Sequence, residues 1–310
     1  MHLRVISPAE TTEEVLSYLV AEPAVANLVV HRGAAVDPAG DVVIADVARE
    51  SANEVLRALK AMGLDKNGSI ALDAVGVALS SRGSEAEKAA PGAGDDAVVW
   101  EEIEQRTGEE SRLSVTFLLF LSIATVIAGI GVLLDQPILI VGAMVVGPEF
   151  GPLAALSVGV IRRRPRVIGR SLLALTVGFA VAIVVTVLST LALNAGGLVT
   201  REMLLGARPL TDFIWRPDAL SWVIAFLAGI AGILSLTTAK SGALIGVLIS
   251  VTTVPAAGNV AVAIAYGVPD EAWGSALQLG INLGAIATAG ILTLAVQRWL
   301  SRRRRPAARA

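Results

Sequence analysis

The 310-residue sequence contains no cysteine, only two histidines and few aromatic residues (4%). The lack of cysteine excludes disulfides, zinc ribbons, iron–sulfur ligation and thiol catalysis. Charged residues make up 17%, against roughly 25% in an ordinary soluble domain. Hydrophobic residues reach 54% and the mean hydropathy is +0.69, which argues against an ordinary cytosolic enzyme. We find no catalytic group, metal-ligand cluster or cofactor motif, and we expect the protein not to be an enzyme.

The charges divide the chain into two unlike parts. Residues 1–112 hold 10 Lys/Arg against 20 Asp/Glu, whereas residues 113–310 hold 15 against 7. The overall charge of −2 therefore describes neither part. This division predicts a soluble acidic segment followed by an apolar, basic one.

The first 80 residues have the pattern of a small α+β domain. Strand-like runs cover residues 3–7, 28–36, 41–47 and 70–79. One helix is expected to begin at Thr11 and another at Ser51, where Glu54 completes a capping box. The order βαββαβ predicts a ferredoxin-like domain over residues 1–80. Because this fold serves many functions, both a regulatory module and a plain assembly domain stay open.

Residues 81–112 are expected to connect this domain to the apolar part. Residues 80–97 are rich in Gly, Ser, Ala and acids, which predicts a linker without a core. Residues 100–112 read as an acidic helix. We expect its carboxylates to pair with cytoplasmic arginines, in particular Glu101, Glu102 and Glu104.

Six apolar segments in residues 113–300 are long enough to cross a bilayer, which needs about 20 residues in a helix. The predicted spans are residues 113–134, 138–161, 167–193, 220–239, 241–266 and 272–297.

The six predicted spans form two similar groups of three consecutive spans. A shift of 107 residues lays Ile138 on Ile245, Pro148 on Pro255 and Gly151 on Gly258. Because each copy has an odd number of spans, the second enters from the opposite side. The sequence therefore predicts an inverted 3+3 repeat with one broken helix in each half.

Basic residues predict the orientation of the spans. If the N-terminal domain is cytoplasmic, Arg162–Arg166, Lys240 and the basic tail 301–310 all lie inside. The loops that contain Arg201, Arg208, Arg216 and Glu271 then lie outside. We expect a bacterial inner-membrane protein with both termini in the cytoplasm. Because the basic clusters lie at membrane boundaries, we interpret them as signals of membrane orientation and expect no nucleic-acid partner.

Proline and glycine interrupt the second and fifth spans near their centres. In lipid, the backbone groups freed by such breaks must face protein or a water-filled cavity, where they are natural contacts for an ion or polar solute. Thr252 and Thr253 would add neutral oxygens. The candidate binding residues are Gly147, Pro148, Glu149, Gly151, Thr252, Thr253, Pro255, Gly258, Asn259 and Asn282.

Glu149 is the only formal charge deep in a predicted span, and intramembrane acids are functional candidates. Alternatively, its carboxylate bonds to the backbone of its own break or faces an oligomer interface. Asn259 is expected to face Gln278 and Asn282, where polar packing between helices is an alternative to solute binding.

The two breaks resemble a known family. Gly142-Ala-Met144, Pro148 and Gly151-Pro-Leu153 resemble a motif of the bacterial and archaeal "uncharacterised hydrophobic domain" membrane proteins, the domain of unknown function numbered 389. The segment from Ile249 to Asn259 resembles the same family. The resemblance covers residues 113–260 best. It implies a multi-span inner-membrane protein and supplies no activity.

The leading functional interpretation is a transporter or channel-like protein that binds a small ion or polar solute between the breaks. The alternative is a membrane sensor or scaffold whose soluble domain binds a ligand or partner. Small residues on lipid-facing surfaces favour a homo-oligomer in the bilayer.

Overall fold

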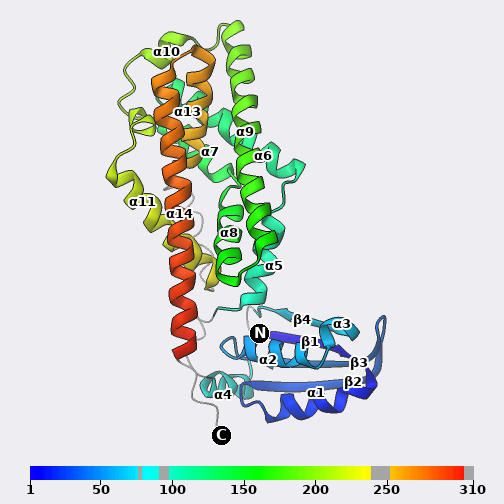
Figure 1. The fold of residues 1–310 in the computed structure, drawn as a ribbon. Coiled ribbons are helices and arrows are strands. Elements are labelled where there is room, and N and C mark those ends of the chain that lie inside the picture. The colour runs from blue at the N-terminus through cyan, green and yellow to red at the C-terminus, as the bar shows by residue number, and fades with distance from the viewer. Residues whose placement is uncertain (76–78, 91–97, 239–251, 304–310) are drawn as a thin grey trace. The chain divides into compact units, whose positions relative to one another are not determined.

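A computed structural model describes residues 1–75, 79–90, 98–238 and 252–303 (Figure 1). The chain divides into two compact units, of which the first includes Met1–Glu102 and the second includes Ile103–Leu236.

The first unit contains a four-stranded sheet in the order β2-β3-β1-β4, with every neighbouring pair antiparallel. Alternate residues of β1 and β3 are buried, which places Leu3, Val5 and Val43 in one core with Leu19 and Leu59 of the helices. The predicted order βαββαβ is confirmed. The elements are β1 (His2–Ser7), α1 (Ala9–Ala21), β2 (Val25–Val36), β3 (Ala39–Val47), α2 (Ala52–Ala61), α3 (Leu64–Asn67) and β4 (Ser69–Asp73).

Several local predictions in this unit need correction. Helix α1 begins at Ala9, before Thr11, and Ser51 precedes α2 without a side-chain capping bond. Ser51 instead accepts the amide of Glu54 through its backbone carbonyl, so the capping box is not formed. Strand β4 ends at Asp73, and residues 76–78 of the predicted strand lie outside the described residues.

The predicted linker also contains a helix, α4 (Ser81–Ala89). Ser80 starts it, since its hydroxyl accepts the amide of Gly83 at 3.1 Å. Ala86 and Ala90 are buried, so this segment does contribute to a small core. Residues 91–97 of the predicted linker lie outside the described residues.

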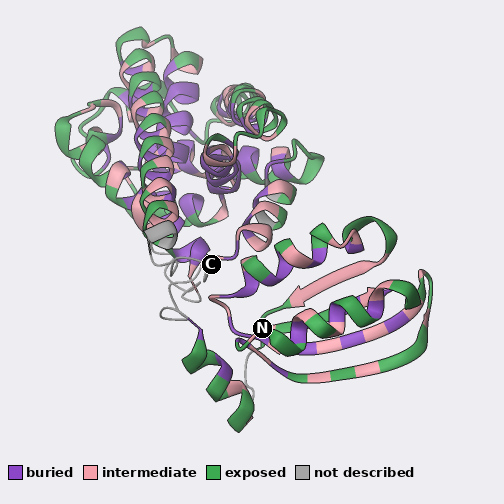
Figure 2. Cartoon of the chain, turned by 60° about the horizontal axis from the view of Figure 1, so that its bottom comes forward, coloured by how far each residue is buried: buried purple, intermediate pink, exposed green. Residues whose placement is uncertain are grey.

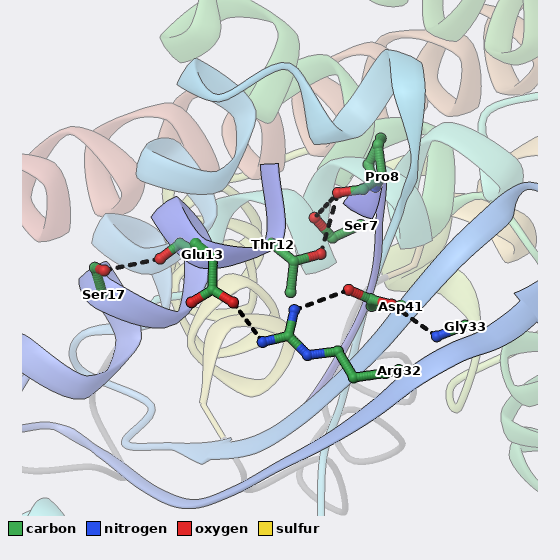
Figure 3. A network of polar contacts seen from close by, with 8 residues as sticks. All are labelled: Ser7, Pro8, Thr12, Glu13, Ser17, Arg32, Gly33 and Asp41. Atoms are coloured by element: carbon green, nitrogen blue, oxygen red, sulfur yellow. Dashed lines mark hydrogen bonds and ion pairs between the residues drawn. The ribbon is translucent and has the colours of Figure 1, made fainter. Parts of the chain in front are cut away.

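Asp41 anchors the polar network that joins β2, β3 and α1 (Figure 3). Its Oδ1 accepts the Gly33 amide at 2.7 Å, and its Oδ2 accepts Arg32 Nη1 at 3.2 Å. Arg32 also donates to Glu13 of α1. The hydrogen bond from the Gly33 amide, helped by Thr12 and Arg32, holds the pKa of Asp41 below its ordinary value.

This lowered pKa predicts that the stability of the first unit depends on pH. Because the folded state prefers the ionised carboxylate, the stabilisation by Asp41 is present above the ordinary pKa of aspartate and is lost as pH falls through the lower folded pKa. Asp41→Asn should therefore lower the melting temperature of this unit at pH 7 and lower it less at pH 3. Thermal unfolding followed by circular dichroism measures the difference. An equal loss at both pH values would contradict the prediction.

The second unit is helical. The elements are α6 (Val115–Leu133), α7 (Pro137–Val146), α8 (Phe150–Arg162), α9 (Pro165–Ala195), α10 (Arg201–Leu205), η2 (Asp212–Trp215), α11 (Ala219–Thr237), α13 (Thr253–Tyr266) and α14 (Pro269–Arg303). Helix α6 packs against α7, α9 and α13, and α8 packs against α9. Residues Thr253–Ala263 are buried without interruption, whereas α9 and α14 have both buried and exposed residues (Figure 2). Helix α13 therefore lies in the interior of this unit.

Four helices, α6, α9, α11 and α14, are long and apolar enough to cross a membrane. The pair α7 and α8 passes the same test as one span bent by 50°. The described residues thus hold four spans, or five with the bent pair, where six were predicted. Residues 241–251 of the predicted fifth span lie outside the described residues, and the rest forms α13, which has only 14 residues. The predicted fifth span, and with it the total of six spans and the inverted repeat, stay predictions.

Helix α5 (Trp100–Glu110) confirms the predicted acidic helix. Glu104 pairs with Arg162 and lies 3.7 Å from Arg164 Nη2, as expected of a contact with the basic α8–α9 boundary. Glu101 and Glu102 have other partners, Lys60 and Arg49 respectively, each at 3.2 Å. The predicted pairing with the boundary arginines therefore holds for Glu104, while the other two carboxylates bond within the first unit.

Candidate functional site

The first break separates α7 from α8. Pro148 cannot donate a backbone hydrogen bond and its ring obstructs the preceding turn, so α7 ends at Val146. Glu149 is the N-cap residue of α8. A Cβ on Gly147 would lie 2.4 Å from Glu149 Oε2 and 2.7 Å from Val254 Cγ2, so a larger residue here would displace the Glu149 carboxylate or Val254. The predicted break is confirmed.

At the second predicted break, the described residues show a helix start. Thr252 is the N-cap residue of α13, and Pro255 lies in the first turn, where a missing N–H is tolerated. Gly258 and Asn259 lie inside the continuous helix. The described residues therefore show no interruption after Thr253, and residues 250 and 251 lie outside them.

Thr253 and Glu149 join the start of α13 to the break between α7 and α8. Thr253 Oγ1 donates to Glu149 Oε1 at 2.6 Å, across 104 residues of sequence. Both side chains are buried, and Glu149 is only 5% exposed. Glu149 Oε2 is also buried and has no hydrogen-bond partner among the described residues. One carboxylate oxygen at the junction is thus open to a further contact.

Helix α14 adds two carboxamides beside this junction. Asn282 Nδ2 donates to Thr252 Oγ1 at 3.0 Å, and Gln278 Nε2 donates to Asn282 Oδ1 at 3.2 Å. Gln278 and Asn282 are both buried. These bonds link the α14 side chains to Thr252, which directly precedes the residue that bonds Glu149.

Asn259 belongs to a different cluster from the one predicted. Its Nδ2 donates to Glu271 Oε1 at 3.0 Å and to Ser275 Oγ at 2.7 Å, not to Gln278 or Asn282. Arg208 Nη2 donates to the same Glu271 oxygen at 2.5 Å. The expected α13–α14 polar contact is present, but it lies one to two turns nearer the start of α14.

Arg208 and Glu271 are the functional candidates that sequence reasoning missed. Both were expected as loop charges outside the membrane, yet they are only 6% and 5% exposed and form an ion pair. Neither residue lies in a segment whose hydrophobic periodicity would indicate that its side chain is buried. The spacing of Glu271, Ser275, Gln278 and Asn282 along one helix was the available signal.

The remaining predicted residues shape the backbone of the site. Gly151 is buried in the first turn of α8. A Cβ on Gly258 would lie 2.8 Å from the Gly129 amide nitrogen and 2.9 Å from the Thr125 carbonyl oxygen. Gly258 therefore allows α13 to approach α6, and the structure does not bring it to the Glu149 junction.

The electrostatics of the junction centre on one carboxyl group. Glu149 lies at the start of α8 and contacts the first residue of α13, and helix N-termini favour negative charge. A buried carboxylate that lacks a second partner binds a cation or takes up a proton. In the described part of the chain, no group of three His, Cys, Asp or Glu side chains is placed to hold a metal ion.

Apolar helices of this length, together with a helix pair bent at a buried acid, are compatible with a membrane protein. A family model described as "Domain of unknown function (DUF389)" matches residues 144–288, which confirms the resemblance seen at the two breaks. An uncharacterized protein of Methanocaldococcus jannaschii is 26% identical over 207 residues, 65% of this chain and 62% of that relative. The chain thus covers less than two thirds of the relative's length. No solved structure matches the chain significantly.

Proposed function

We propose that this membrane protein is a transporter or channel-like protein for a small cation, which binds at Glu149 between the two interrupted segments. The observation that carries the proposal is the Thr253–Glu149 hydrogen bond, which leaves Glu149 Oε2 buried and, among the described residues, without a partner.

The roles of the surrounding residues follow from their chemistry. An intramembrane carboxylate is costly unless it has a functional counter-charge, so Glu149 is the cation ligand. Thr252 and Thr253 orient it and contribute neutral oxygens, and Asn282 holds Thr252. Gly147 leaves the room that the Glu149 carboxylate occupies. We further propose that the protein works as a homo-oligomer in the inner membrane, with both termini cytoplasmic.

Cation flux into proteoliposomes tests this function. The panel contains protons, sodium, potassium and ammonium, each driven by its own gradient. We expect Glu149→Gln to lower the flux at least tenfold, since hydrogen bonds and contacts to a charged group are worth about 1.5–3 kcal/mol and 1.4 kcal/mol is a factor of ten.

Thr190→Val is the matched control. Thr190 is buried in α9, and its hydroxyl donates to the Thr186 carbonyl of its own helix at 2.8 Å. This variant therefore loses a buried hydroxyl that takes no part in the contact between Thr253 and Glu149. It should keep its flux. Equal flux in wild type and Glu149→Gln would reject the site, and no flux for any cation in the panel would reject transport.

A further inference from the structure

Helix α14 has a buried polar stripe in an otherwise apolar span. Its members are Glu271, Ser275, Gln278 and Asn282, at spacings of four, three and four residues. Such spacings place side chains on one face of a helix. All four are buried, so the stripe faces protein rather than lipid. Buried polar faces of membrane helices mark solute and ion pathways.

The stripe links the start of α14 to the Glu149 junction. At one end, Glu271 and Ser275 bond Asn259, and Glu271 also bonds Arg208. At the other end, Gln278 bonds Asn282, which bonds Thr252. The 11 residues from Glu271 to Asn282 rise about 16 Å at 1.5 Å per residue, roughly half of a 30 Å hydrocarbon core. The stripe thus has the length needed to connect a membrane boundary with its centre.

The polar stripe is interrupted after Asn282. The next residues in the direction of the stripe are Ala285 and Ala289, both buried and apolar. The face of α14 that is polar up to Asn282 is therefore apolar at these two positions, before Thr293.

Three buried acceptor oxygens belong to residues on the polar stripe or next to it. Asn259 Oδ1, Gln278 Oε1 and Glu149 Oε2 are buried and have no hydrogen-bond partner in the described part of the chain. Buried polar atoms are normally bonded, so each of these oxygens has room for a donor. Three acceptors in succession fit a positively charged or hydrogen-donating species. At the start of the polar stripe, Arg208 Nε and Nη1 have no hydrogen-bond partner among the described residues, and the buried Arg208–Glu271 pair occupies this end.

We propose that the polar stripe of α14 is the access route of the cation to Glu149, entered from the start of α14 and closed in this structure by the Arg208–Glu271 pair. The proposal rests on the proposed function, because Glu149 is the destination of the route. It adds Asn259 and Gln278 as intermediate contacts for the cation. In this proposal the cation reaches Glu149 from only one side of the membrane, the side on which α14 begins.

Cysteine accessibility tests the route directly, because the sequence has no cysteine of its own. Ser275→Cys and Gln278→Cys place single thiols on the stripe. Ala285→Cys and Ala289→Cys are matched controls, since these positions are buried on the same helix beyond its polar end. The probe is a water-soluble, positively charged methanethiosulfonate, added to proteoliposomes from one side at a time.

Each thiol is measured with the ion pair intact and in the double variant Arg208→Gln/Glu271→Gln, which leaves neither charge unpaired. Thiols react as thiolates, which form only where water reaches them. We expect the double variant to raise the modification rate about tenfold or more at residues 275 and 278, from one side only, and to leave residues 285 and 289 slow. Equal, slow rates at all four positions in both backgrounds would overturn the route.

Thiol labelling does not require transport, so the two proposals fail separately. Flux that depends on Glu149 together with an unreactive stripe rejects the route and keeps the proposed function. A reactive stripe without flux of any cation rejects the proposed function. Gel filtration of each variant checks folding, and the two stripe positions provide independent readings if one of them fails to fold.

Discussion

Glu271→Gln is expected to lower the free energy of unfolding by about 3 kcal/mol or more, because it leaves the Arg208 guanidinium buried without a counter-charge. Arg208 and Glu271 are 6% and 5% exposed and meet at 2.5 Å. Neither charge has bulk water to compensate the loss of the other. Chemical unfolding in mixed micelles, followed by tryptophan fluorescence, measures the change.

A double-mutant cycle separates the pair from its surroundings. Arg208→Gln should cost a similar amount, and the double variant Arg208→Gln/Glu271→Gln should cost clearly less than the two single effects together, since no unpaired charge remains. Arg216→Gln is the control, because Arg216 pairs with Asp212 at an exposed position, where such pairs are worth about 0–1 kcal/mol. Additive effects in the cycle, or a cost as small as that of the control, would show that the buried pair does not hold this end of the unit together.

The burial of this ion pair could not be predicted from the sequence. Pro269, Asp270 and Glu271 look like an ordinary helix start, because acids near a helix N-terminus favour its dipole. Only Glu271 of the three is buried, and its burial depends on how the segment around Arg208 packs against α13 and α14. In contrast, alternating residues predicted the sheet of the first unit, and Pro148 predicted the break between α7 and α8.

The segment from Pro255 to Asn259 shows why a correct motif led to a different local structure. Proline and glycine were interpreted as one broken stretch. Proline is also tolerated in a first helical turn, and glycine also permits close helix packing. In the structure, Pro255 lies in the first turn of the continuous helix α13, and Gly258 allows this helix to pack closely against α6. The Thr253–Glu149 bond joins the start of α13 to the break between α7 and α8, and burial in lipid requires such polar segments to face protein.

Gly258→Ala is expected to destabilise the helical unit by about 1–3 kcal/mol, the usual cost of overpacking. The new Cβ would lie 2.8 Å from the Gly129 nitrogen and 2.9 Å from the Thr125 oxygen. Both atoms are backbone atoms of α6, so no side-chain rotation relieves the clash and α13 must move as a whole. The gain in helix propensity, about 1 kcal/mol for glycine to alanine, offsets only part of this cost.

Gly280→Ala on α14 is the matched control, because nothing lies within 4 Å of its added Cβ and only the propensity gain applies. It should be neutral or stabilising in the same unfolding measurement. The two variants also differ in flux. A shift of α13 away from α6 displaces Thr253, whose hydroxyl lies 2.6 Å from Glu149, so Gly258→Ala should lose flux while Gly280→Ala retains it. If Gly258→Ala matched its control in both stability and flux, the α6–α13 contact would not be what positions Thr253 at the carboxylate.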